Sequence, residues 1–172
     1  MTSLNNDERR QLARLLDESA IRAVVARYAN SLDWMNWPVQ ESLFWEDARI
    51  DFGDAFRGDR AAFMPFVKAL EESYARRMHM FGEPRIQLEG SDAQVEVASV
   101  THVRALSGEG RTDNAVYGRY LLGLQKRGTE WRLSSLYYML NHVASATTRE
   151  SDAGPLNSAD NTCMTHPKAP RF

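Results

Sequence analysis

Apolar residues recur at helical spacing near the N-terminus and at every second position further along the chain. Residues 7–16 predict a short helix, and a second helix, capped by Asp17 or Ser19, should end near Asp33. The apolar stripe of this second helix consists of Ile21, Val24, Val25, Tyr28 and Leu32. Such a stripe is typical of a helix that packs on an apolar surface.

Shorter elements follow before the alternating region begins. Pro38 fits the first turn of a third, short helix, and residues 48–52 alternate as a strand does. Asp59 should cap another helix, in which Pro65 is awkward because an interior proline costs about 3 kcal/mol. We therefore expect a kink there, or a helix that begins only near Met64.

The second half of the chain shows the period of two that is typical of β-strands. Four long strands are predicted, over residues 77–89, 93–106, 112–126 and 131–144. Helices followed by a run of meandering strands indicate the α+β class. A strongly bent sheet around the helices would leave a cone-shaped cavity, a usual place for a small-molecule site.

The domain predicted in this way ends where the periodicity ends. Residues 1–144 should form a single domain, and residues 145–172 should form an irregular C-terminal tail. Pro155, Pro167 and Pro170 argue against a further long strand in the tail, because proline cannot donate to a ladder. We expect the tail to fold back over the protein or over a neighbouring subunit.

Composition and charge mainly exclude certain partners and cellular locations. The chain has 172 residues, a formal net charge of −2 and a pI near 6.1, which argues against nucleic acid or an anionic membrane as a partner. Its single cysteine excludes an internal disulfide. No apolar run approaches the roughly 20 residues of a membrane span, and the N-terminus is too polar for a signal peptide. We therefore expect a cytoplasmic protein.

Two histidines fall where the long strands should meet. His79 lies at the start of the first long strand, and His102 lies where the next strand returns. If the intervening turn near Ser91 has two residues, both histidines share one face of the sheet, whereas a three-residue turn places them on opposite faces. We favour the shared face.

Together with Asp33, these histidines suggest acid–base chemistry. A carboxylate bonded to one ring nitrogen of His79 would fix its tautomer and raise its basicity, so that the other nitrogen could take a proton from a substrate. His102 could then protonate a leaving group or hold an oxyanion. A helix-end aspartate and two structural histidines are the alternative interpretation. A metal held by two histidines and one carboxylate is disfavoured by their spacing.

Aromatic side chains are candidates for substrate contacts. With a two-residue turn at residues 128–129, Tyr120 faces Tyr137 across the last two strands, and one of these tyrosines could enter the cavity as a hydrogen-bond donor. Packing is the alternative role for each of them. The candidate substrate-binding residues are Tyr28, Trp34, Phe52, Tyr120 and Asn141.

Over residues 18–144 the chain resembles the SnoaL-like family of the nuclear-transport-factor-2-like superfamily. The resemblance rests on the pattern Ile21-Arg22-x5-Tyr28-x4-Asp33-x3-Trp37 and on residues 48–53, 78–82 and 130–133. It implies a cone-shaped, curved mixed sheet wrapped around N-terminal helices, the cystatin-like α+β barrel. The acid–base chemistry suggested above would need no cofactor, since proton transfer requires none.

Similarity to two enzyme types within this superfamily implies specific reactions. Similarity to scytalone dehydratases implies that Asp33, His79 and His102 serve an acid–base loss of water. Similarity to hexachlorocyclohexane dehydrochlorinases implies that the first two residues remove a proton while HCl leaves. The leaving-group side departs from the dehydratase pattern, because its two tyrosines fall at Leu32 and Phe52 here.

The favoured function is therefore a cofactor-independent acid–base enzyme that acts on a small hydrophobic, aromatic or polycyclic molecule, most simply as a dehydratase-type lyase. An isomerase or cyclase on the same scaffold stays open. So does a non-catalytic ligand-binding or assembly subunit, of the kind found as the small subunit of ring-hydroxylating dioxygenases. Apolar residues at both parities of the long strands further predict a homodimer or homotrimer, joined through the outer sheet face.

Overall fold

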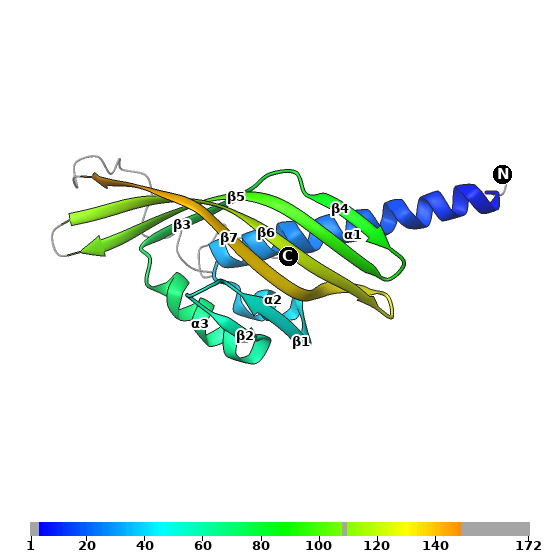
Figure 1. The fold of residues 1–172 in the computed structure, drawn as a ribbon, viewed down its shortest axis with the longest axis horizontal. Coiled ribbons are helices and arrows are strands. Elements are labelled where there is room, and N and C mark those ends of the chain that lie inside the picture. The colour runs from blue at the N-terminus through cyan, green and yellow to red at the C-terminus, as the bar shows by residue number, and fades with distance from the viewer. Residues whose placement is uncertain (1–3, 108–109, 149–172) are drawn as a thin grey trace.

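A computed structural model describes residues 4–107 and 110–148 (Figure 1). The helices are α1 (Asn6–Asp33), α2 (Trp37–Ser42) and α3 (Arg60–Glu72). The strands are β1 (Phe44–Asp51), β2 (Arg57–Asp59), β3 (Arg76–Phe81), β4 (Arg85–Glu89), β5 (Asp92–Ser107), β6 (Gly110–Arg127) and β7 (Glu130–Thr148). The predicted tail lies almost entirely outside the described residues.

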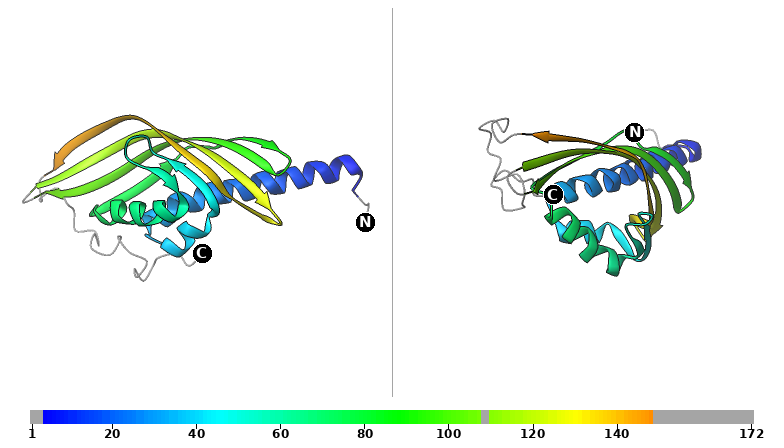
Figure 2. Two further views of the ribbon diagram at one scale, coloured as in Figure 1. Left: turned by 60° about the horizontal axis from the view of Figure 1, so that its bottom comes forward. Right: turned by 60° about the vertical axis from the view of Figure 1, so that its left-hand side comes forward.

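All seven strands belong to one sheet, in the order β2-β1-β7-β6-β5-β3, and β4 pairs with β5 beyond the end of β3. The β1–β7 pair is parallel and the other pairs are antiparallel, so the sheet is mixed. It curves around the helices without closing on itself (Figure 2). The predicted α+β fold, a curved mixed sheet wrapped around N-terminal helices, is confirmed.

The core lies between the helices and the concave face of this sheet. The predicted stripe of α1 is confirmed, since Ile21, Tyr28 and Leu32 are at most 1% exposed. Tyr28 packs edge-on against Phe44 and Tyr120, with ring centroids 6.1 and 5.6 Å away. Burial of a large apolar side chain contributes about 1.5–3 kcal/mol, so this aromatic cluster helps to hold α1 in the curve of the sheet.

Two predicted helix boundaries are wrong. One continuous helix, α1, replaces the two that were expected, and Asn5 caps it through a capping box with Glu8. Asp17 does not interrupt α1, because its carboxylate instead accepts bonds from Lys126 Nζ and Trp131 Nε1 at 2.6 and 2.8 Å. Asp59 caps α3 as predicted, but the helix runs from Arg60 through the proline rather than beginning near residue 64.

The strand predicted over residues 77–89 is divided into β3 and β4. Glu89 pairs with Asp92, as a two-residue turn requires, and this register would place His79 opposite His102 if it continued. The irregular residues 82–84 shift the register by one, so that His79 pairs with Thr101. Neighbouring residues of a strand point to opposite faces. The predicted shared face of the two histidines is therefore wrong.

A similar shift corrects the pairing of the tyrosines. The β6–β7 hairpin begins with the expected register, but an irregularity between Gly123 and Leu124 moves it by one residue. Tyr120 consequently lies opposite Tyr138 rather than Tyr137. A Cβ atom at Gly123 would lie 2.3 Å from Ser135 Oγ, so the close approach at this bulge favours glycine.

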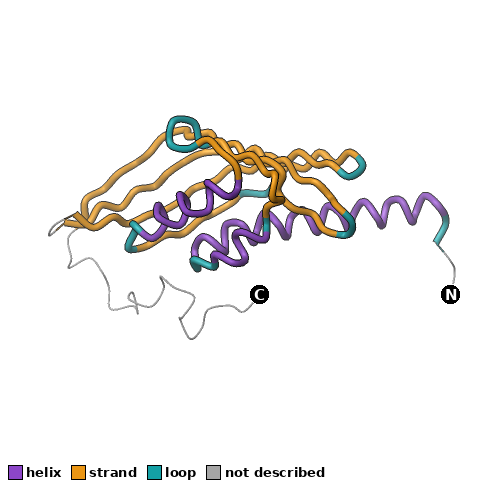
Figure 3. Tube along the Cα trace, turned by 90° about the horizontal axis from the view of Figure 1, so that it is seen from below, coloured by secondary structure: helices purple, strands orange, loops and turns teal. Residues whose placement is uncertain are grey.

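Large apolar side chains also remain exposed. The first turns of α1 project beyond the sheet (Figures 1 and 3) and expose Leu12, Leu15 and Leu16. Met78 and Tyr137 are 48% and 42% exposed on β3 and β7. Within the described residues, no helix is both long and apolar enough to cross a membrane.

The predicted homo-oligomer stays a prediction, which light scattering at micromolar concentration can test. We expect two or three copies, because association would cover exposed apolar side chains of the convex face. Tyr137→Lys should weaken association, whereas Asp54→Lys, in the exposed turn after β1, should not. A monomeric wild-type protein would contradict the prediction.

Candidate active site

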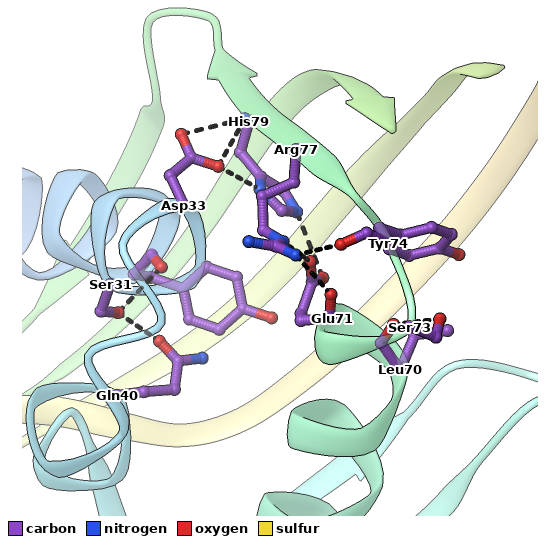
Figure 4. Close-up of polar contacts among 10 residues, drawn as sticks. Ser31, Asp33, Gln40, Leu70, Glu71, Ser73, Tyr74, Arg77 and His79 are labelled. Carbon is purple, nitrogen blue, oxygen red and sulfur yellow. Dashed lines mark hydrogen bonds and ion pairs between the residues drawn. The ribbon is translucent and has the colours of Figure 1, made fainter. Parts of the chain in front are cut away.

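Asp33 connects the end of α1 to the edge strand β3 (Figure 4). Its carboxylate accepts the backbone N–H of His79, with N···O distances of 2.9 and 3.1 Å. An edge strand leaves such groups without a neighbouring strand, and a buried N–H needs a partner. One Asp33 oxygen also lies 2.7 Å from Nδ1 of the His79 ring. The predicted contact between the two residues is confirmed.

This contact fixes how the His79 ring can act. With Asp33 ionised, Nδ1 donates its proton to the carboxylate, and in the neutral ring Nε2 is left as an acceptor. The backbone bond to the same carboxylate holds both partners in position. The His79 side chain is only 4% exposed, whereas that of Asp33 is 23% exposed. The pair therefore lies at the boundary between solvent and the interior, with the ring on the inner side.

A second carboxylate, which the sequence analysis did not single out, lies beside the other ring nitrogen. Glu71 Oε1 is 3.7 Å from His79 Nε2, and the Glu71 side chain is 7% exposed (Figure 4). Glu71 belongs to the last turn of α3. It lies eight residues after Phe63 and four after Val67, on the buried face of that helix. A carboxylate within an apolar stripe was the signal in the sequence that could have revealed it.

Arg77 completes this buried group of charges. Its side chain is 1% exposed, and its Nε lies 3.3 Å from Glu71 Oε2. Its Nη2 donates to the backbone oxygens of Glu71 and Tyr74, at 2.7 and 2.6 Å. Those carbonyls lie at the C-terminal end of α3, where the regular i+4 helical donors end. The Arg77 guanidinium therefore contacts both the carboxylate and the backbone oxygen of Glu71 and holds that residue in place.

Burial alters the acidity of this interior. It raises the pKa of Glu71 above the ordinary 4.5, and the charges of His79 and Arg77 oppose this rise only in part. Burial likewise raises the pKa of Tyr28 and Tyr120, and Glu71 adds to both shifts. This interior thus favours the neutral forms of Glu71, Tyr28 and Tyr120.

His102 is not brought to this site. It is exposed on the convex face, opposite Met78, where the two residues line a groove of about 430 Å³ together with Arg76 and Arg104. The register shift that separates it from His79 removes the geometric basis for a joint role. No three His, Cys, Asp or Glu side chains of the described residues form a group suited to a metal ion.

The five predicted substrate-binding residues are divided between the core and the surface. Tyr28 and Tyr120 are buried, and the half-buried Phe52 lies 6.3 Å from Tyr120 between ring centroids. Trp34 follows α1 directly as its C-cap residue. Asn141 is exposed on β7 and lines a separate groove of about 370 Å³. Their roles toward a substrate stay predictions.

The family profile for the SnoaL-like domain matches residues 13–137, which is most of the chain. The chain therefore belongs to the SnoaL-like family. No curated protein sequence matches this SnoaL-like chain at a significant level.

Solved structures of several other proteins share its fold. A protein proposed to be a scytalone dehydratase from Novosphingobium aromaticivorans has a TM-score of 0.70 and 20% identity, over 79% of this chain and 91% of that chain. A hexachlorocyclohexane dehydrochlorinase from Novosphingobium barchaimii has a TM-score of 0.72 and 14% identity, over 79% and 94%. A protein of unknown function with a cystatin-like fold from Nostoc punctiforme has a TM-score of 0.60 and 19% identity, over 73% and 92%.

The raised pKa of Glu71 predicts how stability depends on pH. A carboxyl with a raised pKa in the folded state stabilises the protein below its unfolded pKa, and this contribution is lost as pH rises through the folded pKa. Glu71→Gln keeps a neutral side chain at every pH. At pH 8 its melting temperature should exceed that of wild type by roughly 2–4 °C, and near pH 4 the two should converge.

Thermal unfolding of both proteins between pH 4 and pH 8 measures this difference. Glu72→Gln is the matched control, since Glu72 is the exposed neighbour of Glu71 on the same helix. A Glu71→Gln protein that is less stable than wild type at pH 8 would show that its ion pair with Arg77 outweighs the cost of its burial.

Proposed function

We propose that this SnoaL-like protein is a cofactor-independent acid–base enzyme in which Asp33 and His79 form the proton-abstracting dyad. The observation that carries the proposal is the 2.7 Å contact between Asp33 Oδ1 and His79 Nδ1, which leaves Nε2 as the free acceptor of the neutral ring. The backbone contact of the same carboxylate supports it, because the ring is held by more than one bond.

The proposed reaction is an elimination of the dehydratase type. His79 Nε2 removes a proton from a carbon next to an activating group, and the C–H electron pair forms the new double bond. The bond between the neighbouring carbon and the leaving group breaks, and the leaving group departs with the electron pair of that bond. Asp33 stabilises the imidazolium that forms, as a carboxylate hydrogen-bonded to a catalytic histidine does. The names of the dehydratase and the dehydrochlorinase with this fold support loss of water or HCl as the reaction class.

The surroundings of the dyad support the proposed substrate class. Aromatic rings pack through the concave side of the sheet, and Tyr120 lies between Phe81 and Tyr138, with centroids 5.1 and 4.7 Å away. Such an environment suits a small hydrophobic or aromatic molecule. Because the His79 side chain is 4% exposed, covering side chains must move before a substrate reaches Nε2. Isomerisation or cyclisation of the same substrate class requires the same first step.

One observation favours a second candidate, a non-catalytic binding or assembly domain. The interior is occupied by packed aromatic side chains, among them the fully buried Tyr28, Phe44 and Phe63. A cone filled in this way needs no substrate. Under this alternative the Asp33–His79 contact serves only to fasten α1 to the edge strand.

A search for proton abstraction separates the two candidates. The protein is incubated in D2O with a panel of small aromatic β-hydroxy and β-chloro ketones, and NMR follows both elimination and carbon-bound deuterium. Wild type should convert at least one compound. His79→Gln should lower its turnover by about 10²-fold or more, because general base catalysis contributes about that much.

His102→Gln is the matched control, since His102 is exposed on the other face of the same sheet. It should retain wild-type turnover, and circular dichroism should show that both variants are folded. Absence of exchange and elimination with every compound would favour the binding or assembly domain. Full activity in His79→Gln would reject the dyad.

A further inference from the structure

Loss of water, unlike loss of chloride, needs an acid as well as a base, and the geometry of the described residues leaves the place of that acid open. The base removes a proton from carbon, while the departing oxygen needs a proton of its own. His102 was the predicted donor, but it lies on the face of the sheet opposite to His79. The acid must instead lie on the concave face, close to His79 Nε2.

Glu71 occupies that position. Its Oε1 lies 3.7 Å from His79 Nε2, and both side chains are nearly buried, at 7% and 4% exposure. The carboxyl group projects from the end of α3, whereas the imidazole projects from β3, so two elements converge on one point (Figure 4). A substrate proton bound to Nε2 would therefore lie beside a second group that can exchange it.

The charges around this point favour one additional proton. Arg77 contributes a fixed positive charge, and the carboxylates of Asp33 and Glu71 contribute two negative charges. With a neutral imidazole, the four groups carry one net negative charge, and three of them, Arg77, His79 and Glu71, are at most 7% exposed. An unbalanced buried charge is costly, and a single proton removes the imbalance. Either His79 or Glu71 can hold that proton.

We propose that Glu71 and His79 share one exchangeable proton, and that Glu71 is the acid of the proposed elimination. The role of Glu71 as the acid rests on the proposed function, whereas the shared proton does not. In the resting site Glu71 holds the proton and His79 is neutral. His79 takes the proton from carbon, and Glu71 gives its proton to the departing hydroxide, which leaves as water.

The cycle closes without any further reactant. After the elimination His79 carries one proton more and Glu71 one proton fewer. Transfer of the proton from Nε2 to Oε1, across the short gap between them, restores the resting site. The substrate has then lost one molecule of water, and the enzyme is unchanged.

The groups around the Glu71 carboxyl determine the direction in which its pKa is shifted. Arg77 and His79 lower the pKa of Glu71, Asp33 raises it, and burial raises it most of all. The groups on every element around the carboxyl are Asp33 and Tyr28 on α1, Tyr74 after α3, Arg77 and His79 on β3, and Tyr120 on β6. The tyrosines stay neutral at physiological pH because burial raises the pKa of each of them.

NMR titration of the full-length protein tests the shared proton without a substrate. Glutamate labelled with 13C at its carboxyl group reports Glu71, and 15N-labelled histidine reports the His79 ring. The Glu71 signal should change at a pH above the ordinary 4.5, and the His79 ring signals should change over the same pH range, as coupled groups do. A Glu71 signal that titrates alone, in the ordinary range for glutamate, would overturn the inference.

Variants identify the signals and sharpen the test. In His79→Gln, the Glu71 midpoint should move to higher pH, because the imidazolium charge that favours its ionisation is lost. His102→Gln and Glu72→Gln should leave that midpoint unchanged, since both residues are exposed and lie outside the group. The glutamate signal whose midpoint moves in His79→Gln but not in the two control variants is assigned to Glu71. The assignment therefore does not require Glu71→Gln, and the test stands even if that variant fails to fold.

Activity measurements separate this inference from the proposed function. With a compound that wild type converts, Glu71→Gln should lower kcat by about 10²-fold and remove one limb of the pH–rate profile. Unchanged kcat in Glu71→Gln, together with loss of activity in His79→Gln, would overturn the role of Glu71 as the acid but not the dyad. A coupled titration in a protein that converts no compound would uphold the shared proton and overturn the proposed elimination.

Discussion

The carboxylate of Asp33 is the constraint on which the site depends. It has two roles: it accepts the backbone N–H of His79, which the edge strand leaves without a strand partner, and it orients the His79 ring. A carboxylate at the C-terminal end of a helix opposes the helix dipole, so this position has a local cost that the contacts with His79 offset. The end of the longest helix and the edge of the sheet are thereby fastened at one point.

The curved sheet and the ends of α1 and α3 bring several ionisable side chains together around the His79 ring. The concave face buries the apolar side of α1, and β3 forms its edge, so the His79 ring lies between the core and solvent. The end of α3 reaches the same place and brings Glu71 against the inner nitrogen. Arg77 holds that helix end by its carbonyls and balances part of the negative charge. Three elements thus meet in one group of buried ionisable side chains.

Much of this arrangement could be predicted from the sequence. The periodicity of α1, the cap at Asp59, the α+β order of elements and the meeting of Asp33 with His79 all follow from local patterns or from the family resemblance. Patterns of this kind are strong because every residue of an element contributes to them.

The errors share a different physical origin. The irregular residues 82–84 and the bulge at Gly123 each shift a register by one residue, and a single step changes the face of every side chain beyond it. This step separated His102 from His79. The apolar stripe of α3 could have revealed that Glu71 is buried, but its contact with His79 depends on how the end of α3 meets β3, which no local pattern specifies. Single-residue register and tertiary docking are therefore the limits of such a prediction.

The central claim is that Asp33 holds the proton of Nδ1, so that Nε2 of neutral His79 is free to act as the base. The 15N chemical shifts of the His79 ring, measured at a pH where the ring is neutral, report its tautomer directly. The account predicts a protonated Nδ1 and an unprotonated Nε2, with that preference weakened in Asp33→Asn. A ring protonated at Nε2 in the wild-type protein would contradict it, since that nitrogen could then accept no proton from a substrate.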